Sequence, residues 1–351
     1  MQQLDGRPKT VLFNIVAEYI HTGEPVGSRT LSKKSDLGLS AATIRNIMSD
    51  LTEWGYIMQP HVSAGRVPTD IGYRFYVNAV LGGGSATGTE EADVRTIEGL
   101  LKEAGMDVRD VLRQSSCVLA VLSKKAGVVT AIAPEEQRFK TIDFIKVAED
   151  KVLVVLMSST GFIQNWIIYD EDGTSQETLE RYGRIMNDML RDLDLRQARE
   201  RIEQELRSDG ILVDAMMAKA LRLGHMILSR DAFREVFIEG STNILDEPEF
   251  ANIDSLKAIL HAFEDKSKLL KILDKTLQAT GLQILIGSEH GLGELETCSI
   301  IAYPIRAGDI VLASISVIGP KRMNYKKLVP LVFTTGRILT KMARGMVENP
   351  L

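Results

Sequence analysis

The side chains best suited to recognising nucleic acid cluster near the N-terminus of the 351-residue chain. The guanidinium of Arg45 can bond guanine bidentately or clasp a phosphate, and the amide of Asn46 can read adenine. Neighbouring hydroxyls can donate to phosphate oxygens, and small alanines permit close approach to a groove. We predict a DNA-contact surface that consists of Ser28, Arg29, Thr30, Lys33, Lys34, Ser40, Ala41, Ala42, Thr43, Arg45, Asn46, Ser63 and Arg66.

The charge around these residues differs from the charge of the whole chain. The chain carries 42 Lys and Arg against 47 Asp and Glu, and this net −5 taken alone argues against a polyanion partner. Residues 1–78 carry eight Lys and Arg against seven Asp and Glu, which leaves a net −6 for the rest. Between Ser28 and Asn46 the sole acid is Asp36. An acidic chain therefore has a locally basic segment where the contact residues lie.

Helical periodicity predicts the elements that hold these residues. Pro8 suits the first turn of a helix, and apolar residues recur at helical spacing after it. Ser28 can cap a short second helix, and Ser40 can cap a third helix that runs to Trp54. The third helix then exposes Ala41, Ala42, Thr43, Arg45 and Asn46 near its N-terminus, where a recognition helix contacts base edges.

A hairpin is predicted after the third helix. Residues 56–59 and 67–69 can pair as two short strands around the polar tip 61–66, which includes the basic Arg66. A helix-turn-helix followed by such a hairpin is a winged helix-turn-helix. If Gly65 holds a positive φ, a side chain there distorts the hairpin, so Gly65→Val is expected to disrupt the wing.

The glycine and small-polar run at residues 82–89 separates this N-terminal head from the rest of the chain, and such a run is typical of a flexible linker. Strand patterns, a long helical stretch at 177–228 and further strands follow. This order predicts an α+β fold in which an antiparallel domain carries an inserted, mainly helical subdomain. The predicted strands are 140–147, 151–157, 162–169, 282–287, 298–305 and 310–318, closed by a helix over 325–347. The predicted divisions are 1–81 for the DNA-binding head, 82–105 for the flexible linker and lead-in, 106–350 for the antiparallel domain, and about 190–252 for the insertion.

Motifs for catalysis and metal binding are missing from the sequence. No phosphate-binding loop ending in Gly-Lys occurs, and no HExxH, GxSxG or GxGxxG pattern. Cys117 and Cys298 lie far apart with no histidine near either at metal spacing, so neither a disulfide nor a zinc site is supported. The five histidines, isolated in the sequence, are His21, His61, His225, His261 and His290. We therefore expect no enzyme activity, no catalytic residue, no cofactor and no metal.

The start of the chain has no apolar core of a signal peptide, and its longest apolar stretches fall short of the roughly 18 residues that a spanning helix needs. We expect a cytoplasmic protein without membrane association. Residues 288–294 are polar and glycine-rich enough for a ligand loop, but we interpret them as a turn.

Several segments resemble, in the same order, the heat-inducible transcription repressor family, HrcA. In the head these are residues 23–31, GEPVGSRTL, residues 39–51, LSAATIRNIMSDL, and residues 61–69, HVSAGRVPT. In the body they are residues 237–245, FIEGSTNIL, and residues 248–250, PEF. The resemblance spans nearly the whole chain.

This resemblance implies a repressor with a winged-helix head, a GAF-like body and an inserted dimerising domain. It also implies a homodimer that binds an inverted-repeat operator in double-stranded DNA upstream of chaperone operons. A GroE-type chaperonin helps such repressors to reach the DNA-binding form. Two other functions stay open: a small-molecule sensor that uses the GAF-like domain, and a head that binds RNA.

Overall fold

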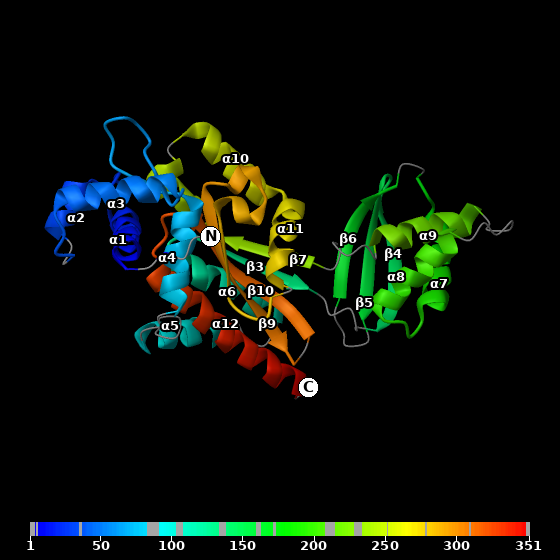
Figure 1. The fold of residues 1–351 in the computed structure, drawn as a ribbon. Helices are drawn as coiled ribbons and strands as arrows, with labels where there is room; N and C mark the ends of the chain where they lie inside the picture. Colours follow the sequence, from blue (N-terminus) through cyan, green and yellow to red (C-terminus); the bar gives the residue numbers. More distant parts are fainter. Residues whose placement is uncertain are drawn as a thin grey trace. The chain divides into compact units, whose positions relative to one another are not determined.

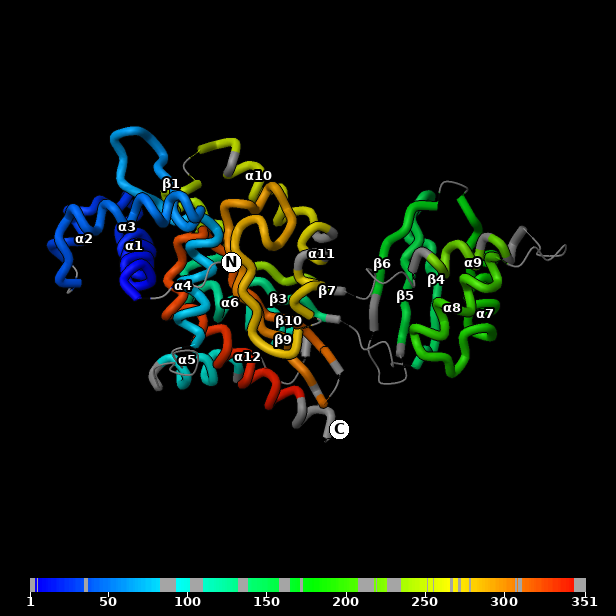
Figure 2. The backbone as a smooth tube through the Cα atoms, viewed as in Figure 1, coloured from blue at the N-terminus to red at the C-terminus, as the bar shows by residue number. Residues whose placement is uncertain are grey.

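The computed structural model describes residues 4, 6–34, 37–82, 91–102, 108–132, 138–158, 163–170, 173–207, 215–227, 234–250, 252–277, 279–308 and 310–348. The chain forms two compact units, one from Met1–Ala131 with Val236–Leu351 and the other from Ile132–Glu235. Figure 2 traces the chain through the first unit, into the second and back. None of the described helices is long and apolar enough to cross a membrane.

The first unit begins with a head of helices and one hairpin (Figure 1). Its elements are α1 (Arg7–Thr22), α2 (Ser28–Lys34), α3 (Ala41–Glu53), β1 (Ile57–Met58), β2 (Val67–Pro68) and α4 (Asp70–Gly82). Pro8 lies in the first turn of α1, and Gly23 takes the left-handed conformation that ends this helix. Because β1 pairs antiparallel with β2, the predicted order of helices and hairpin is confirmed.

The rest of the first unit, which we call the body, is a five-stranded sheet with helices on both faces. The strand order is β7 (Arg234–Glu239), β3 (Ala126–Ile132), β10 (Ile310–Pro320), β9 (Cys298–Ala307) and β8 (Gln283–Ile286). Strand β10 pairs antiparallel with β3 and β9. The helices are α5 (Glu91–Lys102), α6 (Val108–Ser123), α10 (Ile253–Glu264), α11 (Lys266–Leu277) and α12 (Tyr325–Glu348). Short 3-10 turns are η3 (Ser241–Asp246), η4 (Pro248–Phe250), η5 (Gly287–His290) and η6 (Gly293–Leu295).

Alternation along β10 explains why both faces of the sheet are covered. Ala313, Ile315 and Val317 belong to a core that the sheet shares with α5, α6, α12 and the head. Ser314 points to the other side, where its hydroxyl lies 3.1 Å from the hydroxyl of Thr276 in α11. Successive strand residues point to opposite faces, so one strand contributes to both layers.

The second unit consists of a three-stranded antiparallel sheet and helices on one side of it. Its elements are β4 (Phe139–Ala148), β5 (Lys151–Ser158), β6 (Ile163–Tyr169), α7 (Gln176–Leu190), α8 (Leu195–Arg207) and α9 (Ala215–Ile227). Ile142, Phe144 and Val154 are buried in one core with Met186 of α7 and Ile202 of α8. The strands and the helices of this unit therefore fold around one core.

The predicted insertion at about 190–252 was wrong in its boundaries and in its mainly helical composition. The second unit is Ile132–Glu235, and it includes the sheet β4-β5-β6. The boundaries follow from strand pairing. Strands β4, β5 and β6 bond to one another in a sheet of their own, whereas β7 lies beside β3 in the five-stranded sheet of the body. Periodicity identified the strands but not the sheet that they join.

The predicted flexible segment 82–105 was wrong in part. Helix α5 occupies residues 91–102 of it, and Ile97 and Leu101 are fully buried in the core of the first unit. The rest of the glycine-rich run after Gly82, residues 83–90, lies outside the described residues. The head, α5 and the body share one core, so the head is packed on the body.

Candidate nucleic-acid interface

Helix α3 presents the predicted recognition residues to solvent. The hydroxyl of Ser40 accepts a hydrogen bond from the backbone N–H of Thr43 at 3.1 Å, which caps the helix as predicted. Ile44, Ile47, Met48 and Leu51 are buried on one face of α3. On the other face Ala42, Arg45 and Asn46 are exposed. The 3.6-residue period of the apolar stripe therefore turns these three side chains outward.

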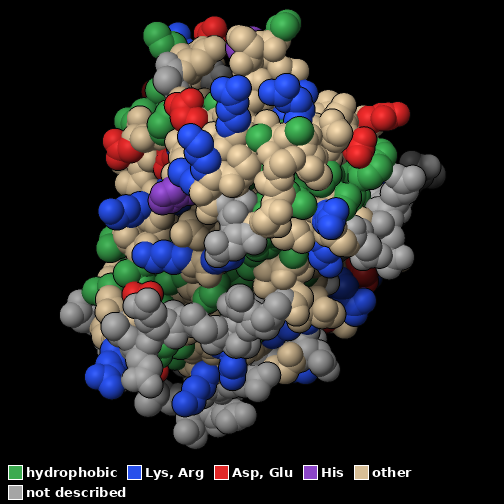
Figure 3. Space-filling model, turned by 60° about the vertical axis from the view of Figure 1, so that its left-hand side comes forward, with side chains coloured by type: hydrophobic (Ala, Val, Ile, Leu, Met, Phe, Trp, Pro, Cys, Tyr) green, Lys and Arg blue, Asp and Glu red, His purple; other side chains and the backbone are tan. Residues whose placement is uncertain are grey.

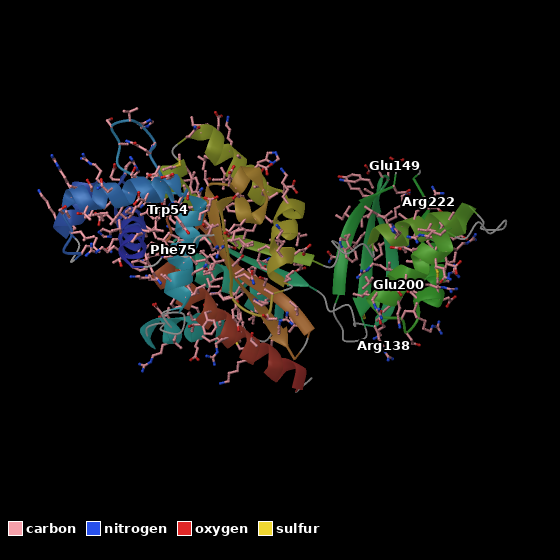
Figure 4. The ribbon with its side chains drawn as sticks, viewed as in Figure 1. Trp54, Phe75, Arg138, Glu149, Glu200 and Arg222 are labelled. Carbon is pink, nitrogen blue, oxygen red and sulfur yellow. The ribbon has the colours of Figure 1, made fainter. Side chains whose placement is uncertain are left out.

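Charge divides the exposed face of α3 into two halves. Arg45 and Asn46 lie in the first half, and Asp50 and Glu53 are exposed in the second, near Trp54 (Figure 4). A phosphate is attracted to the positive N-terminal end of a helix and repelled by acids near its C-terminus. This distribution favours contact with a polyanion through the first turns of α3 only.

Helix α2 adds cations beside the start of α3. Arg29, Thr30 and Lys33 are exposed, whereas Ser28, predicted to donate to a phosphate, is buried with 9% of its surface accessible. Lys34 is exposed but forms an ion pair of 2.6 Å with Glu18 of α1. Among the described residues no ion pair engages Arg29 or Lys33. Lys and Arg side chains are spread over the face turned forward in Figure 3.

The hairpin positions Arg66 differently from the prediction. Its backbone exchanges two hydrogen bonds of 2.9 Å with Val26, and its Nε donates to the Thr52 hydroxyl of α3 at 3.1 Å. Arg66 is half-buried and therefore lies at the base of the wing, tied to α3, and not at the tip. Its partners are distant in sequence, so the local pattern did not reveal them.

The tip of the hairpin carries Ser63, which is exposed as predicted, and Val62, which is 99% exposed and was not predicted. The side-chain amide of Gln59 donates to the backbone oxygens of Val62 and Ala64, at 2.8 and 3.1 Å. These bonds hold the tip in one shape. An apolar residue inside a polar turn was the only sequence signal for Val62.

Gly65 is required for a reason other than the one predicted. Its φ is not positive, so the left-handed conformation on which the expectation for Gly65→Val was conditional does not occur. Instead, a Cβ at this position would lie 2.6 Å from the backbone of Pro25 and Val26. The wing and the segment before α2 approach so closely that only glycine fits.

The structure leaves most of the predicted contact residues exposed on α2, on α3 and in the hairpin of the head. Those exposed are Arg29, Thr30, Lys33, Lys34, Ser40, Ala42, Arg45, Asn46 and Ser63; those half-buried are Ala41, Thr43 and Arg66; Ser28 is buried. The described residues include no group of three His, Cys, Asp or Glu side chains that could hold a metal ion. Burial raises the pKa of the Cys298 thiol to about 12, so this thiol is a poor nucleophile.

The helices, the hairpin and the exposed polar start of α3 define a protein of the helix-turn-helix class. The family description "HrcA protein C terminal domain" matches residues 109–329. The heat-inducible transcription repressor HrcA of Syntrophobacter fumaroxidans is 40% identical over 99% of this chain and 100% of that protein. The one of Geobacter sulfurreducens is 39% identical over 98% of this chain and 100% of that protein. The chain belongs to the HrcA family, which consists of transcription repressors and not of enzymes.

A solved structure supports the fold of the whole chain. The crystal structure of a hypothetical protein at 2.2 Å resolution is similar with a TM-score of 0.62 and 24% sequence identity. The likeness covers 98% of this chain and 99% of the other. The arrangement of an N-terminal helical region and antiparallel sheets is therefore one already seen in a solved structure.

Proposed function

We propose that the chain binds double-stranded operator DNA through a winged-helix head and represses chaperone operons in response to heat. The observation that carries this proposal is the exposed start of α3, where Arg45 and Asn46 project beside the cations of α2. Arg45 would read guanine or clasp a phosphate, and Asn46 would read adenine. The printed names of the relatives, heat-inducible transcription repressors, support the regulatory role.

We propose that the repressor acts as a homodimer on an inverted repeat. Support comes from the side of the β4-β5-β6 sheet turned away from α7, which we call the outer sheet face. Ile145 pairs with Leu153 and Leu153 with Ile167, so three apolar side chains form a row across the strands. Ile145 is 43% exposed, Ile167 60% and Tyr169 71%. A contiguous exposed apolar surface of this kind marks a protein interface, and a second copy of the chain is the occupant we propose.

We propose that the body is GAF-like, and that the repressor reaches its active form with the help of a GroE-type chaperonin. The chaperonin proposal is supported by the pairing of strands that are distant in sequence within the five-stranded sheet. The hydroxyl of Ser316 in β10 donates to the Val128 carbonyl of β3 across 188 residues of sequence. The sheet therefore cannot close until the last strands are available, and such non-local sheets fold slowly and expose apolar surface meanwhile. A chaperonin encloses chains in that state.

Selection from a pool of random duplex DNA tests the DNA-binding proposal. The full chain is expected to enrich an inverted repeat, and to bind it in preference to single-stranded RNA at the same salt concentration. Failure to enrich any duplex would overturn DNA binding, and enrichment of one half-site alone would overturn the dimer. A footprint on the protein's own upstream region, with and without chaperonin and ATP, tests the folding dependence.

A small-molecule sensor is the second candidate, and one observation favours it. The Thr130 hydroxyl in β3 is buried and has no hydrogen-bond partner among the described residues. It neighbours Ser314 across the sheet, on the side of α11 where Thr276 lies. A ligand that bonded to Thr130 would satisfy this hydroxyl. Calorimetric titration with a metabolite set tests the idea, and the absence of any binding heat would dismiss it.

A further inference from the structure

Helix α4 of the head carries two charged side chains that both contact the body. Asp70 and Arg74 are one helical turn apart, so they project from the same face of α4. Their partners lie in the turn after β8 and in the turn between β10 and α12. Residues 288–294, which we interpreted from the sequence as a turn, include part of this contact.

Asp70 is held by three hydrogen bonds from the body. Its Oδ2 accepts from the backbone N–H and the hydroxyl of Ser288, both at 3.1 Å, and its Oδ1 accepts from Lys321 Nζ at 2.6 Å. Burial alone would raise the pKa of Asp70, but the bonds from Lys321 and Ser288 outweigh it and lower the pKa. Gly287 has φ +53°, and a Cβ there would lie 2.3 Å from the Asp70 carboxylate. The turn is shaped to receive this carboxylate.

Arg74 makes a forked contact one turn later. Its Nε donates to Glu289 Oε1 at 2.8 Å, its Nη2 donates to the Ile284 carbonyl at 2.6 Å, and Nη2 also pairs with Glu289 Oε2. The carboxylate of Glu289 is itself oriented, because its Oε2 accepts the backbone N–H of Ile286 at 2.9 Å. A forked guanidinium contact fixes direction as well as distance.

Arg322, the neighbour of Lys321, contacts the other side of the head. It forms an ion pair with Glu249, and its Nη1 donates to the Ile20 carbonyl of α1 at 3.4 Å. The ammonium of Lys326 lies 5.3 Å from the ring centre of Phe13 in α1. The turn before α12 therefore holds both α1 and α4.

We infer that the contacts of Asp70 and Arg74 with Ser288, Glu289 and Lys321, which we call the head latch, set the orientation of the DNA-binding head on the body. The inference rests on the proposed reading of two half-sites by two heads. Partly exposed ion pairs add little to the free energy of folding. The forked contact of Arg74 instead fixes the direction in which α4 meets the body.

The orientation has a consequence for DNA. Two heads of fixed orientation on their bodies present their α3 helices over a narrower range of separations, and the second contact is intramolecular only for half-sites within that range. Heads held only by the shared core and by the contacts of Arg322 and Lys326 can vary more in orientation and accept a wider range of separations. Asp70, Arg74 and Glu289 are thus positioning residues, which would govern the preferred half-site spacing without touching DNA.

The test compares Arg74→Glu, Glu289→Arg and the double exchange Arg74→Glu/Glu289→Arg in the full chain. The double exchange restores the total charge and allows the pair to re-form with reversed direction. It restores neither the bond to the Ile284 carbonyl nor the bond from the Ile286 N–H, so the recovery is partial. Arg181→Glu is the matched control, because it breaks the exposed ion pair of Arg181 with Glu177 in α7 and makes the same charge change. Asp70→Asn is a milder second variant if the charge reversals reduce folding.

One readout needs no DNA. Hydrogen exchange of the peptide that contains Ser288, whose N–H bonds to Asp70, is expected to accelerate in both single variants and in Asp70→Asn. It should return toward the wild-type rate in the double exchange and stay unchanged in the control. Unchanged exchange in every variant of the latch would overturn it.

The second readout uses the inverted repeat selected by the wild-type chain, with base pairs inserted between its half-sites, and one half-site alone. The ratio of the affinity for the native spacing to the affinity for an altered spacing is expected to be about tenfold smaller in the single variants than in the wild type. A change of this size is usual for such coupling. The double exchange should recover part of this discrimination, and the half-site affinity of every variant should match that of the control. Faster exchange with unchanged discrimination would overturn the positioning role. If the wild type enriches no inverted repeat, the proposed function fails, and the exchange data still decide whether the latch exists.

Discussion

The exposed start of α3 and the outer sheet face are the two surfaces that we propose for binding, and their side chains differ in chemistry. The first is polar and basic, with Arg45 and Asn46 on a helix whose other face is buried. The second is apolar, with Ile145, Leu153 and Ile167 in one row across three strands. A charged surface is typical of contact with a charged, hydrated partner, whereas an apolar surface is typical of an interface from which water is excluded.

The difference shows which kind of surface a sequence reveals. A charged recognition helix is a local feature, because its cap, its apolar stripe and its exposed residues lie within about four turns. An apolar sheet face is a non-local feature. Alternation shows that Ile145 and Val147 share a face, but not whether a helix covers that face. Functional surfaces on sheets therefore need the tertiary structure, whereas those on helix ends do not.

The largest expected effect comes from placing a charge on the outer sheet face. Ile167→Glu would put a carboxylate beside Leu153 at the proposed dimer contact, where an unpaired charge cannot be desolvated. We expect a monomer whose affinity for the two-site operator falls by about 100-fold or more, since the second contact is no longer intramolecular. Light scattering measures the mass, and a gel-shift titration measures the affinity.

The control for this experiment is Val121→Glu. Val121 of α6 is 68% exposed, close to the 60% of Ile167, but it lies on another surface. The control is expected to remain a dimer with wild-type affinity, and the head should stay folded in both variants. Tight operator binding by a proven monomer would remove the dimer from the proposal.

Arg45→Ala should produce the next largest effect, at the other surface. We expect a loss of roughly 1 to 3 kcal/mol in binding free energy with relaxed selectivity at one base, if Arg45 reads a base edge. A contact with phosphate would instead weaken all sequences equally and reduce the salt dependence. Titrations against the selected operator and its single-base variants separate the two, with Arg196→Ala, an exposed arginine of α8, as the control. Wild-type binding by Arg45→Ala would dismiss both roles.

Gly65→Val tests the link between the wing and the segment before α2. Its Cβ would meet the Pro25 and Val26 backbone at 2.6 Å, so the wing must shift, at a cost of about 1 to 3 kcal/mol in the free energy of unfolding. Urea denaturation measures the loss. Gly99→Ala of α5 is the control: nothing lies within 4 Å of its added Cβ, so a gain of about 0.5 to 1 kcal/mol is expected. A wild-type midpoint for Gly65→Val would show that the approach is not tight.

The sequence predicted what depends on neighbours along the chain. The Ser40 cap, the buried stripe of α3 and the antiparallel hairpin follow from residues within one short stretch, and the structure has them. Arg66 was misplaced because its partners, Val26 and Thr52, are 40 and 14 residues away. A pattern of basic and small residues does not reveal such pairings.

The insertion was misplaced for the same physical reason. The strands of residues 139–169 were recognised, but their membership of a separate sheet depends on pairing with one another and on packing against α7. The contact between α4 and the turn after β8 joins Arg74 to Glu289 across 215 residues, so no local rule predicts it. Long-range pairing sets domain boundaries, and periodicity does not encode it.

The smallest expected effect concerns which cations of the head touch phosphate. Lys33 is exposed and outside any ion pair among the described residues, whereas Lys34 is paired with Glu18 and Arg66 with the Thr52 hydroxyl. A cation that neutralises one phosphate contributes about 0.9 to the slope of log affinity against log salt. Lys33→Ala should reduce the slope by that amount, and Lys34→Ala and Arg66→Ala by clearly less, because those side chains must first leave an intramolecular partner. Affinities measured between about 50 and 200 mM salt give the salt slopes of the three variants. An equal reduction in all three would mean that DNA displaces Glu18 and Thr52, and that the helices of the head rearrange on binding.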